Sequence, residues 1–254
     1  MRKGIYILPN SITLCGMTLG FYSILASLKG DFVYAAWAIL FANISDALDG
    51  WVARITNTTS KFGVQLDSLS DLLAFGVAPA ILVFSWGLHE LGRGGWAAPL
   101  LLVLCAALRL ARFNVQSDSA ESRCFTGMPT PSSATILTSG ILVCLEDKIS
   151  FPGLRYFFLG LTILLGLLMV STVRYHSLKE VTAIKKKPFW VLVVVVLIVF
   201  LIQLSPHRTI FIASFLYLVS GLIEAVFRVR RKRPPAGGKP TLGAVQATMR
   251  ADKA

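Results

Sequence analysis

Charged side chains are scarce in this sequence. Asp, Glu, Lys and Arg make up only 15% of its 254 residues, and hydrophobic residues make up 55%, whereas soluble domains contain about 25% charged residues. The mean hydropathy is +0.68, which excludes a soluble globular domain. It also makes nucleic acid a poor partner, although the net charge is +12. The composition therefore indicates a protein of the lipid bilayer.

Cysteine and histidine are also few, and neither forms a recognisable site. The four cysteines show no CxxC pairing and mostly lie in apolar surroundings, which is typical of small buried hydrophobic side chains. The three histidines are isolated and fall near the ends of predicted loops. The sequence has no obvious internal repeat either. The carboxylates are therefore the candidate functional groups of this protein.

Eight apolar runs are candidate membrane-spanning helices, since about 20 helical residues cross a bilayer core of about 30 Å. They cover residues 9–28, 32–53, 65–86, 95–114, 131–146, 156–174, 189–204 and 209–228. We therefore predict an all-α, polytopic transmembrane bundle of about eight helices over residues 1–228. Residues 229–254 are basic and rich in Pro and Gly, which predicts a disordered cytoplasmic tail.

The basic residues indicate how the helices are oriented. Eight crossings put both termini on one side, and that side with its loops holds 20 of the 25 Lys and Arg residues. Because cytoplasmic loops carry the excess of basic residues, we expect both termini in the cytoplasm. Basic residues beside a membrane also attract anionic headgroups, so membrane lipids are expected partners.

Aspartate is unevenly placed in this chain. Four of its eight aspartates, Asp46, Asp49, Asp67 and Asp71, lie within 26 residues. An aspartate at the centre of a membrane helix costs about 2.5–3.5 kcal/mol, and intramembrane carboxylates are by default functional candidates. The alternative is that they merely end one helix and begin the next. The helix dipole favours Asp67 near a helix start but disfavours Asp46 and Asp49 near a helix end, so this alternative explains half of the pattern at most.

The spacings bring the four carboxylates together. Asp46 and Asp49 are three residues apart and Asp67 and Asp71 are four apart, so each pair lies on one helix face. The polar link between the two helices is short, which makes them antiparallel neighbours. Four like charges cannot all stay ionised at close range without cations, and oxygen-only ligands suit a hard ion. We expect Mg²⁺ or Mn²⁺, as two ions that share the carboxylates in a clamp suited to displacement at phosphorus.

Small residues and one arginine extend this site. Gly50, Ala53 and Gly63 leave room where helix backbones or a ligand come close, and Arg54 can bind a phosphate oxygen in a bidentate manner. The residues thus predict a divalent-metal phosphotransfer site at the cytoplasmic surface. A cation- or proton-coupled transporter is the alternative, although transporters often show internal repeats and sites near the midplane.

The pattern Asp46-x2-Asp49-Gly50-x2-Ala53-Arg54-x8-Gly63-x3-Asp67-x3-Asp71 resembles the signature of the CDP-alcohol phosphotransferases at every fixed position. The resemblance implies that all four aspartates bind metal and that Asp71 is also the general base. It implies a CDP-linked lipid as donor and CMP as leaving group. The residues it assigns to the CDP moiety are Asp46, Asp49, Gly50, Ala53, Arg54, Ser60 and Gly63.

Three longer phrases resemble the bacterial integral-membrane phosphatidylserine synthases within that family. They are LPNSITLCGMTLGF at 8–21, ALRLARFNV at 107–115 and FTGMPTPSSA at 125–134. This resemblance implies CDP-diacylglycerol as donor and L-serine as acceptor. It also implies a homodimer in the bacterial inner membrane, with its active site facing the cytoplasm. Glycerol 3-phosphate, inositol and choline are the alternative acceptors.

Arg109, Arg112 and Asn114 are the candidate acceptor residues. An arginine at the cytoplasmic end of the fourth helix could hold the carboxylate of serine or a lipid phosphate, and we favour Arg112. The alternative is that both arginines anchor the helix at the membrane surface. The segment 126–131, TGMPTP, is either a cover over the site or a simple connection before a helix that starts after Pro131. No Ser, Cys or His stands beside a base to suggest a covalent intermediate, so we expect direct displacement.

Overall fold

The computed structural model describes residues 7–56, 60–117, 127–171, 200 and 203–231, and every regular element within these ranges is a helix. In chain order they are α1 (Ile7–Lys29), α2 (Phe32–Ile55), α3 (Lys61–Asp71), the π-helical turn η1 (Leu72–Val77), α4 (Ala78–Trp86), the 3₁₀ turn η2 (Leu88–Leu91), α5 (Gly92–Ser117), α6 (Thr130–Glu146), α7 (Leu154–Val170) and α9 (Pro206–Arg231). The predicted all-α class is confirmed.

Five helical stretches are long and apolar enough to cross a membrane: Leu8–Lys29, Phe32–Ile55, Phe62–Trp86, Leu88–Val115 and Pro206–Ile223. Helix α7 is a shorter apolar helix. The protein is therefore an integral membrane protein, as the composition predicts. The expected helix at 189–204 lies almost wholly outside the described residues, and so does the tail beyond residue 231.

The third helix begins earlier than the sequence suggests. Hydropathy places its start at 65, whereas α3 begins at Lys61 because Ser60 caps it, with the Ser60 Oγ accepting a hydrogen bond from the Gly63 N–H at 2.9 Å. Serine is among the preferred N-cap residues, since its oxygen satisfies one of the first free N–H groups. The polar first turn is thus helical, although no hydrophobic pattern marks it.

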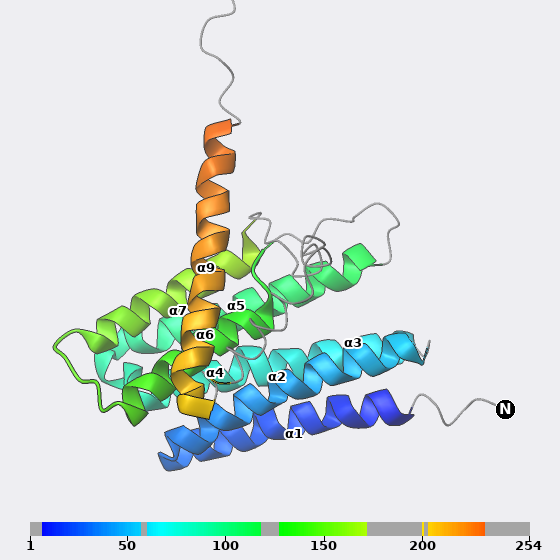
Figure 1. The fold of residues 1–254 in the computed structure, drawn as a ribbon, viewed down its shortest axis with the longest axis horizontal. Coiled ribbons are helices and arrows are strands. Elements are labelled where there is room, and N and C mark those ends of the chain that lie inside the picture. The colour runs from blue at the N-terminus through cyan, green and yellow to red at the C-terminus, as the bar shows by residue number, and fades with distance from the viewer. Residues whose placement is uncertain (1–6, 57–59, 118–126, 172–199, 201–202, 232–254) are drawn as a thin grey trace, which may run out of the picture.

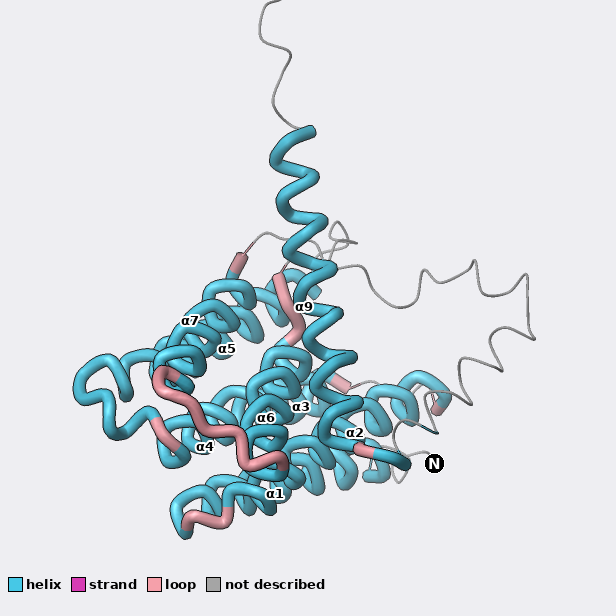
Figure 2. Tube along the Cα trace, turned by 60° about the vertical axis from the view of Figure 1, so that its left-hand side comes forward, coloured by secondary structure: helices cyan, strands magenta, loops and turns pink. Residues whose placement is uncertain are grey.

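The two ends of the bundle differ in what they carry. The start of α1, the end of α2, the start of α3 and the end of α5 lie together at one end, and the α1–α2 turn and the α6–α7 connection lie at the other (Figure 1). Helix α9 crosses the other helices steeply in both views (Figure 2). The aspartate-bearing parts of α2 and α3 therefore lie toward the end of the bundle where the N-terminus enters.

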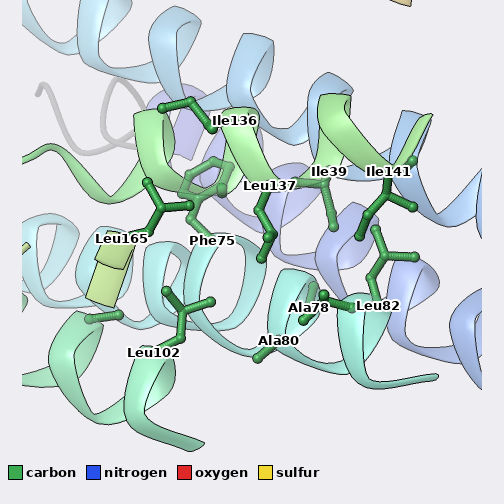
Figure 3. Close-up of a cluster of buried hydrophobic side chains, with 14 of the residues drawn as sticks. Ile39, Phe75, Ala78, Ala80, Leu82, Leu102, Ile136, Leu137, Ile141 and Leu165 are labelled. Carbon is green, nitrogen blue, oxygen red and sulfur yellow. The ribbon is translucent and has the colours of Figure 1, made fainter. Parts of the chain in front are cut away.

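The hydrophobic core lies where α2, η1, α4, α5, α6 and α7 meet (Figure 3). Its side chains include Ile39 of α2, Phe75 of η1, Leu82 of α4, Leu137 of α6 and Leu165 of α7, each no more than 2% exposed. Because η1 follows α3 directly, the chain that carries Asp67 and Asp71 runs straight into this core. The core thus fixes how far α3 can move.

The π-helical turn η1 begins immediately after Asp71. At its end the Ala78 N–H donates to the carbonyl of Leu73, five residues back. Pro79 comes next, and in a regular α-helix its ring would clash with the carbonyl four residues earlier. The wider turn relieves that clash. Single π-turns are frequent at functional sites, and this one connects Asp71 directly to the core.

Helix α9 packs on α6 and is held near its start by an ion pair. Arg208 donates to both carboxylate oxygens of Asp147, with its Nη2 at 2.7 Å from Oδ1 and its Nε at 2.9 Å from Oδ2. These hydrogen bonds hold the pKa of Asp147 below its usual value. The pair fixes the position at which α9 joins the bundle.

Helix α1 approaches the third helix very closely at a glycine. Gly16 and Gly20 are four residues apart, the spacing that lets membrane helices pack tightly. A Cβ placed on Gly20 would lie 2.7 Å from the Cα of Ala74 in η1. At that distance the two backbones are in contact, and no side chain can fit between them.

We expect Gly20→Ala to lower the free energy of unfolding by about 1–3 kcal/mol, because the added methyl meets backbone that cannot move aside. Gly160→Ala on α7 is the matched control, since a Cβ there meets nothing within 4 Å. Thermal unfolding in detergent compares the two. Equal melting temperatures for both variants would contradict the tight contact between α1 and η1.

Candidate active site

The structure brings the four aspartates together from two helices. One carboxylate oxygen each from Asp46, Asp49 and Asp67 lies within 4.8 Å of the others. The fourth carboxyl group, on Asp71, interacts with that of Asp46. Asp49 is buried and the other three are partly buried. The carboxylates of α2 and α3 therefore lie together, as their spacing in the sequence predicts.

This donor set fits a divalent cation. All three clustered donors are carboxylate oxygens, the ligand type that Mg²⁺ and Mn²⁺ prefer. Carboxylates this close together repel one another unless a cation neutralises them. The acidic cluster is therefore a candidate metal centre, formed by Asp46, Asp49 and Asp67 with Asp71 alongside.

Thr13 of α1 orients one of these carboxylates. Its Oγ1 donates to the Asp49 Oδ2 at 2.8 Å and also lies 3.1 Å from the carbonyl oxygen of Pro9. Thr13 is only 6% exposed, so the bond to Asp49 is shielded from water. Outer hydrogen bonds of this kind fix the orientation of metal-binding side chains.

Two serines tie α1 to the helices that carry the aspartates. Ser45, next to Asp46, donates its hydroxyl hydrogen to the carbonyl of Ile12 at 2.9 Å. Ser70, next to Asp71, donates to the carbonyl of Thr13 at 3.1 Å. Helix α1 thus holds α2 and α3 in register with each other at the level of the carboxylates.

A cavity of about 200 Å³ opens beside the acidic cluster. It is lined by Pro9, Asn10 and Thr13 of α1, Asp49, Gly50, Ala53 and Arg54 of α2, and Ser60, Gly63, Val64 and Asp67 around the start of α3. Six of the seven residues assigned to the CDP moiety line it, and Asp46 is the exception. The volume is below that of whole-ligand pockets, so only part of a substrate can sit in it.

Arg54 stands at the edge of this cavity. Its Nε donates to the carbonyl of Gly50 at 2.8 Å, and among the described residues no acceptor binds its two terminal nitrogens. A Cβ on Gly50 would meet nothing within 4 Å, so the glycine leaves open space next to the guanidinium. Arg54 also lines a second, larger cavity of about 560 Å³ on the outer face of α2.

Gly63 and Ser60 shape the other wall of the smaller cavity. A Cβ on Gly63 would lie 3.1 Å from the Ser60 Oγ and 3.2 Å from the Asn10 Oδ1. Both oxygens therefore crowd this point, and the Ser60 oxygen already caps α3. A side chain at this position would therefore have to displace one of these two oxygens slightly.

The two candidate arginines of α5 have different surroundings. Arg109 is half-buried, and its Nη1 donates to the Thr130 Oγ1 at 2.6 Å. It interacts electrostatically with Asp71 and with Tyr217 of α9. Arg112 is exposed. The structure thus brings Arg109, rather than the favoured Arg112, to the aspartate site.

Asn114 links α5 to α3. Its side chain and that of Ser68 exchange hydrogen bonds, with distances of 3.1 and 3.0 Å, and its Nδ2 lies 3.4 Å from the Gln65 Oε1. Ser68 follows Asp67 directly. Asn114 therefore supports the helix that carries the carboxylates, in addition to any contact with a substrate.

Asn10, Thr13 and Thr130 are the site residues that sequence reasoning missed. All three fall inside the longer phrases at 8–21 and 125–134, but their roles depend on contacts across the bundle. The one local signal is polarity near the start of the first helix, where Asn10 and Thr13 lie three residues apart and so share a face.

Comparison with known proteins places this arrangement in a family. Residues 6–173 match the family model described as CDP-alcohol phosphatidyltransferase. The chain belongs to the CDP-alcohol phosphatidyltransferase family. It is 37% identical over 225 residues to a CDP-diacylglycerol–serine O-phosphatidyltransferase of Helicobacter pylori strain J99. The aligned residues are 88% of this chain and 92% of that protein.

Two further relatives extend this comparison. An archaetidylserine synthase of Methanothermobacter thermautotrophicus is 36% identical over 170 residues, 66% of this chain and 69% of the relative. A CDP-diacylglycerol–serine O-phosphatidyltransferase of Mycobacterium leprae is 30% identical over 220 residues, which are 84% of this chain and 72% of the relative. The similarity thus extends beyond the matched family segment. The acidic cluster of this CDP-alcohol phosphatidyltransferase lies wholly within that segment.

We expect Thr13→Val to weaken divalent-metal binding by about 10–100-fold, because Asp49 loses the hydrogen bond that orients it. Titration with Mn²⁺, followed by electron paramagnetic resonance, measures this without reference to activity. Thr18→Val on the same helix is the control, since among the described residues the Thr18 hydroxyl bonds only the carbonyl of Leu14. An unchanged Mn²⁺ affinity in Thr13→Val would show that this bond does not orient the carboxylate.

Proposed function

We propose that this protein transfers the phosphatidyl group of CDP-diacylglycerol to the hydroxyl of L-serine, giving phosphatidylserine and CMP. The observation that carries the proposal is the convergence of Asp46, Asp49 and Asp67 beside a cavity whose rim holds Arg54. The names of the relatives support it, since two are CDP-diacylglycerol–serine O-phosphatidyltransferases and one is an archaetidylserine synthase.

The metal assignment follows from the donor set. Asp46, Asp49, Asp67 and Asp71 would hold Mg²⁺ or Mn²⁺, as two ions, which supply the positive charge that stabilises a displacement at phosphorus. Arg54 adds a guanidinium on the same side. Its Nε is bonded to the carbonyl of Gly50, and we assign its terminal nitrogens to the pyrophosphate.

Arg54 lines two cavities, and we assign one part of the donor lipid to each of them. The smaller is lined by polar and small residues, among them Asn10 and Ser60, and we assign it to the nucleotide. The larger is lined by Asn43, Ile44, Ala47, Leu48, Trp51 and Arg54, and we assign it to the start of the acyl chains. Arg54 then lies where the pyrophosphate joins the two halves of the lipid.

Asp71 is assigned the role of general base. It accepts the proton of the serine hydroxyl, and the serine oxygen forms a bond to the lipid-side phosphorus. The bond between that phosphorus and the oxygen of CMP breaks at the same time. Arg109 interacts with Asp71 electrostatically and is placed to hold the serine carboxylate beside the base. Arg112 and Asn114 lie farther along the same helix and complete the proposed acceptor side.

The membrane orientation and the assembly are also proposals. We place the acidic cluster and both termini on the cytoplasmic side of a bacterial inner membrane, on the distribution of basic residues. Labelling of single-cysteine variants from either side of the membrane tests this. The homodimer rests on the family resemblance alone, and light scattering of the purified protein tests it.

The proposed reaction predicts that purified protein releases CMP from CDP-diacylglycerol when serine and Mg²⁺ or Mn²⁺ are present. Glycerol 3-phosphate, inositol and choline are assayed in parallel. Release with a different alcohol alone would keep the metal site and overturn the assignment of serine. No release with any alcohol would overturn the phosphotransfer reaction and favour an ion-coupled transporter.

We expect Asp71→Asn to bind CDP-diacylglycerol normally and to lower kcat by about 10²–10⁴-fold, because an amide cannot accept the hydroxyl proton. Asp31→Asn is the control, since Asp31 lies before α2 at the opposite end of the bundle and makes no capping hydrogen bond. Equilibrium binding of the lipid and single-turnover CMP release separate the two effects. Normal turnover in Asp71→Asn would remove Asp71 from the role of base.

A further inference from the structure

We infer that Thr130 is a positioning residue that holds Arg109 so that one edge of its guanidinium is reserved for the carboxylate of the acceptor. This inference rests on the proposed function, and it names what selects serine. Its basis is the hydrogen bond from the Arg109 Nη1 to the Thr130 Oγ1, at 2.6 Å between α5 and α6.

The bond leaves a specific part of Arg109 unused. Among the described residues, none accepts a hydrogen bond from its Nε, although that atom is buried. A buried donor without a partner is costly, and such groups in native structures call for an explanation, an absent ligand among them. Nε and Nη2 together form the edge that pairs with a carboxylate through two parallel hydrogen bonds. Thr130 engages the other nitrogen, Nη1, and among the described residues this edge is left without a hydrogen-bond acceptor at Nε.

The position of that edge agrees with an acceptor site. Arg109 interacts electrostatically with Asp71, the residue proposed to take the hydroxyl proton. Serine carries its carboxylate and its hydroxyl on neighbouring carbon atoms, so the groups that bind them must lie close together. Tyr217 of α9 also interacts electrostatically with Arg109.

Thr130 is itself firmly placed. It is fully buried, it begins α6 between two prolines, and its carbonyl accepts a hydrogen bond from the Ser133 hydroxyl at 2.8 Å. The preceding segment is anchored on α7, where the Met128 N–H donates to the carbonyl of Leu168 at 3.1 Å. A residue anchored in this way can restrict the rotation of an arginine side chain.

A glycine lets the chain enter this arrangement. Gly127 has a φ of +91°, and a Cβ there would lie 2.3 Å from the carbonyl oxygen of Met169. Only glycine fits such a backbone and such a contact. The described part of the TGMPTP segment, from Gly127 onward, is therefore a rigid support that packs on α7 and delivers Thr130 to Arg109.

The consequence is selectivity for an acceptor with a carboxylate. Ethanolamine is serine without that group, so it would leave the reserved edge of Arg109 unpaired. Sites built to pair a polar group reject analogues that lack it by large factors, because a buried partner is left without its hydrogen bonds. Loss of the Thr130 oxygen would free the guanidinium to turn toward Asp71 and would weaken this discrimination.

The test compares Thr130→Val, which keeps the shape and removes the oxygen, with Thr130→Ser, which keeps the oxygen. In Thr130→Val we expect the KM for serine to rise by about tenfold or more, the scale of a lost hydrogen bond to a charged group. We expect the KM for CDP-diacylglycerol to stay unchanged, and the preference for serine over ethanolamine, as a ratio of kcat/KM values, to fall by a similar factor. Thr130→Ser should restore both values.

Thr138→Val is the matched control. Thr138 is also a fully buried threonine of α6, and within the described part of the chain its hydroxyl has no hydrogen-bond partner. If Thr130→Val does not fold, Thr130→Ala replaces it, and we expect the same changes in the serine KM and in the preference for serine over ethanolamine.

Two results would separate the possible failures. A serine KM and a serine-to-ethanolamine preference that match those of Thr138→Val would overturn the role of Thr130 and leave the proposed reaction intact. A wild-type protein that releases no CMP with serine would overturn the proposed function itself.

Discussion

Mutual repulsion among four carboxylates is the constraint on which the rest of this structure depends. In an apolar bundle such a cluster is unfavourable unless cations neutralise it, yet Asp46, Asp49 and Asp67 lie within 4.8 Å of one another. Helix α1 is what keeps them there. Its contact at Gly20 holds it against the third helix, and the Thr13 hydroxyl engages Asp49 directly. The packing that stabilises the bundle is therefore also the packing that forms the site.

The same geometry explains where the site lies. A CDP-lipid has a polar head and an apolar tail, so it can only be held at the boundary between the two phases. Arg54 lines both cavities, the smaller of which is formed by α1, α2 and the start of α3, whereas the lining of the larger includes Ile44, Leu48 and Trp51 of α2. A guanidinium suits this junction, because it binds phosphate at its head while its stem lies along apolar surface.

The sequence predicts the fold class and the convergence of the aspartates, because helical spacing and a short link leave few arrangements. It does not predict contacts between distant residues. Thr13 and Asp49 are 36 positions apart, and nothing local indicates that they meet. Arg109 and Arg112 share a face by spacing, so only the packing of α6 decides which of them is enclosed. The π-turn after Asp71 follows from Pro79, a local signal whose usual meaning is a helix end or a kink.

The acceptor side that we propose is built on different helices from the candidate metal site, and this separation has a physical consequence. Thr130 and Arg109 belong to α6 and α5, supported by α7, whereas the clustered carboxylates belong to α2 and α3. The surroundings of the acceptor can therefore differ without moving the groups that act on phosphorus. Acceptor alcohols present the same hydroxyl, so discrimination must come from the group beside it. Since Arg109 is already partly desolvated in the folded protein, its pairing with a carboxylate costs little further desolvation, while an acceptor without one gains nothing there.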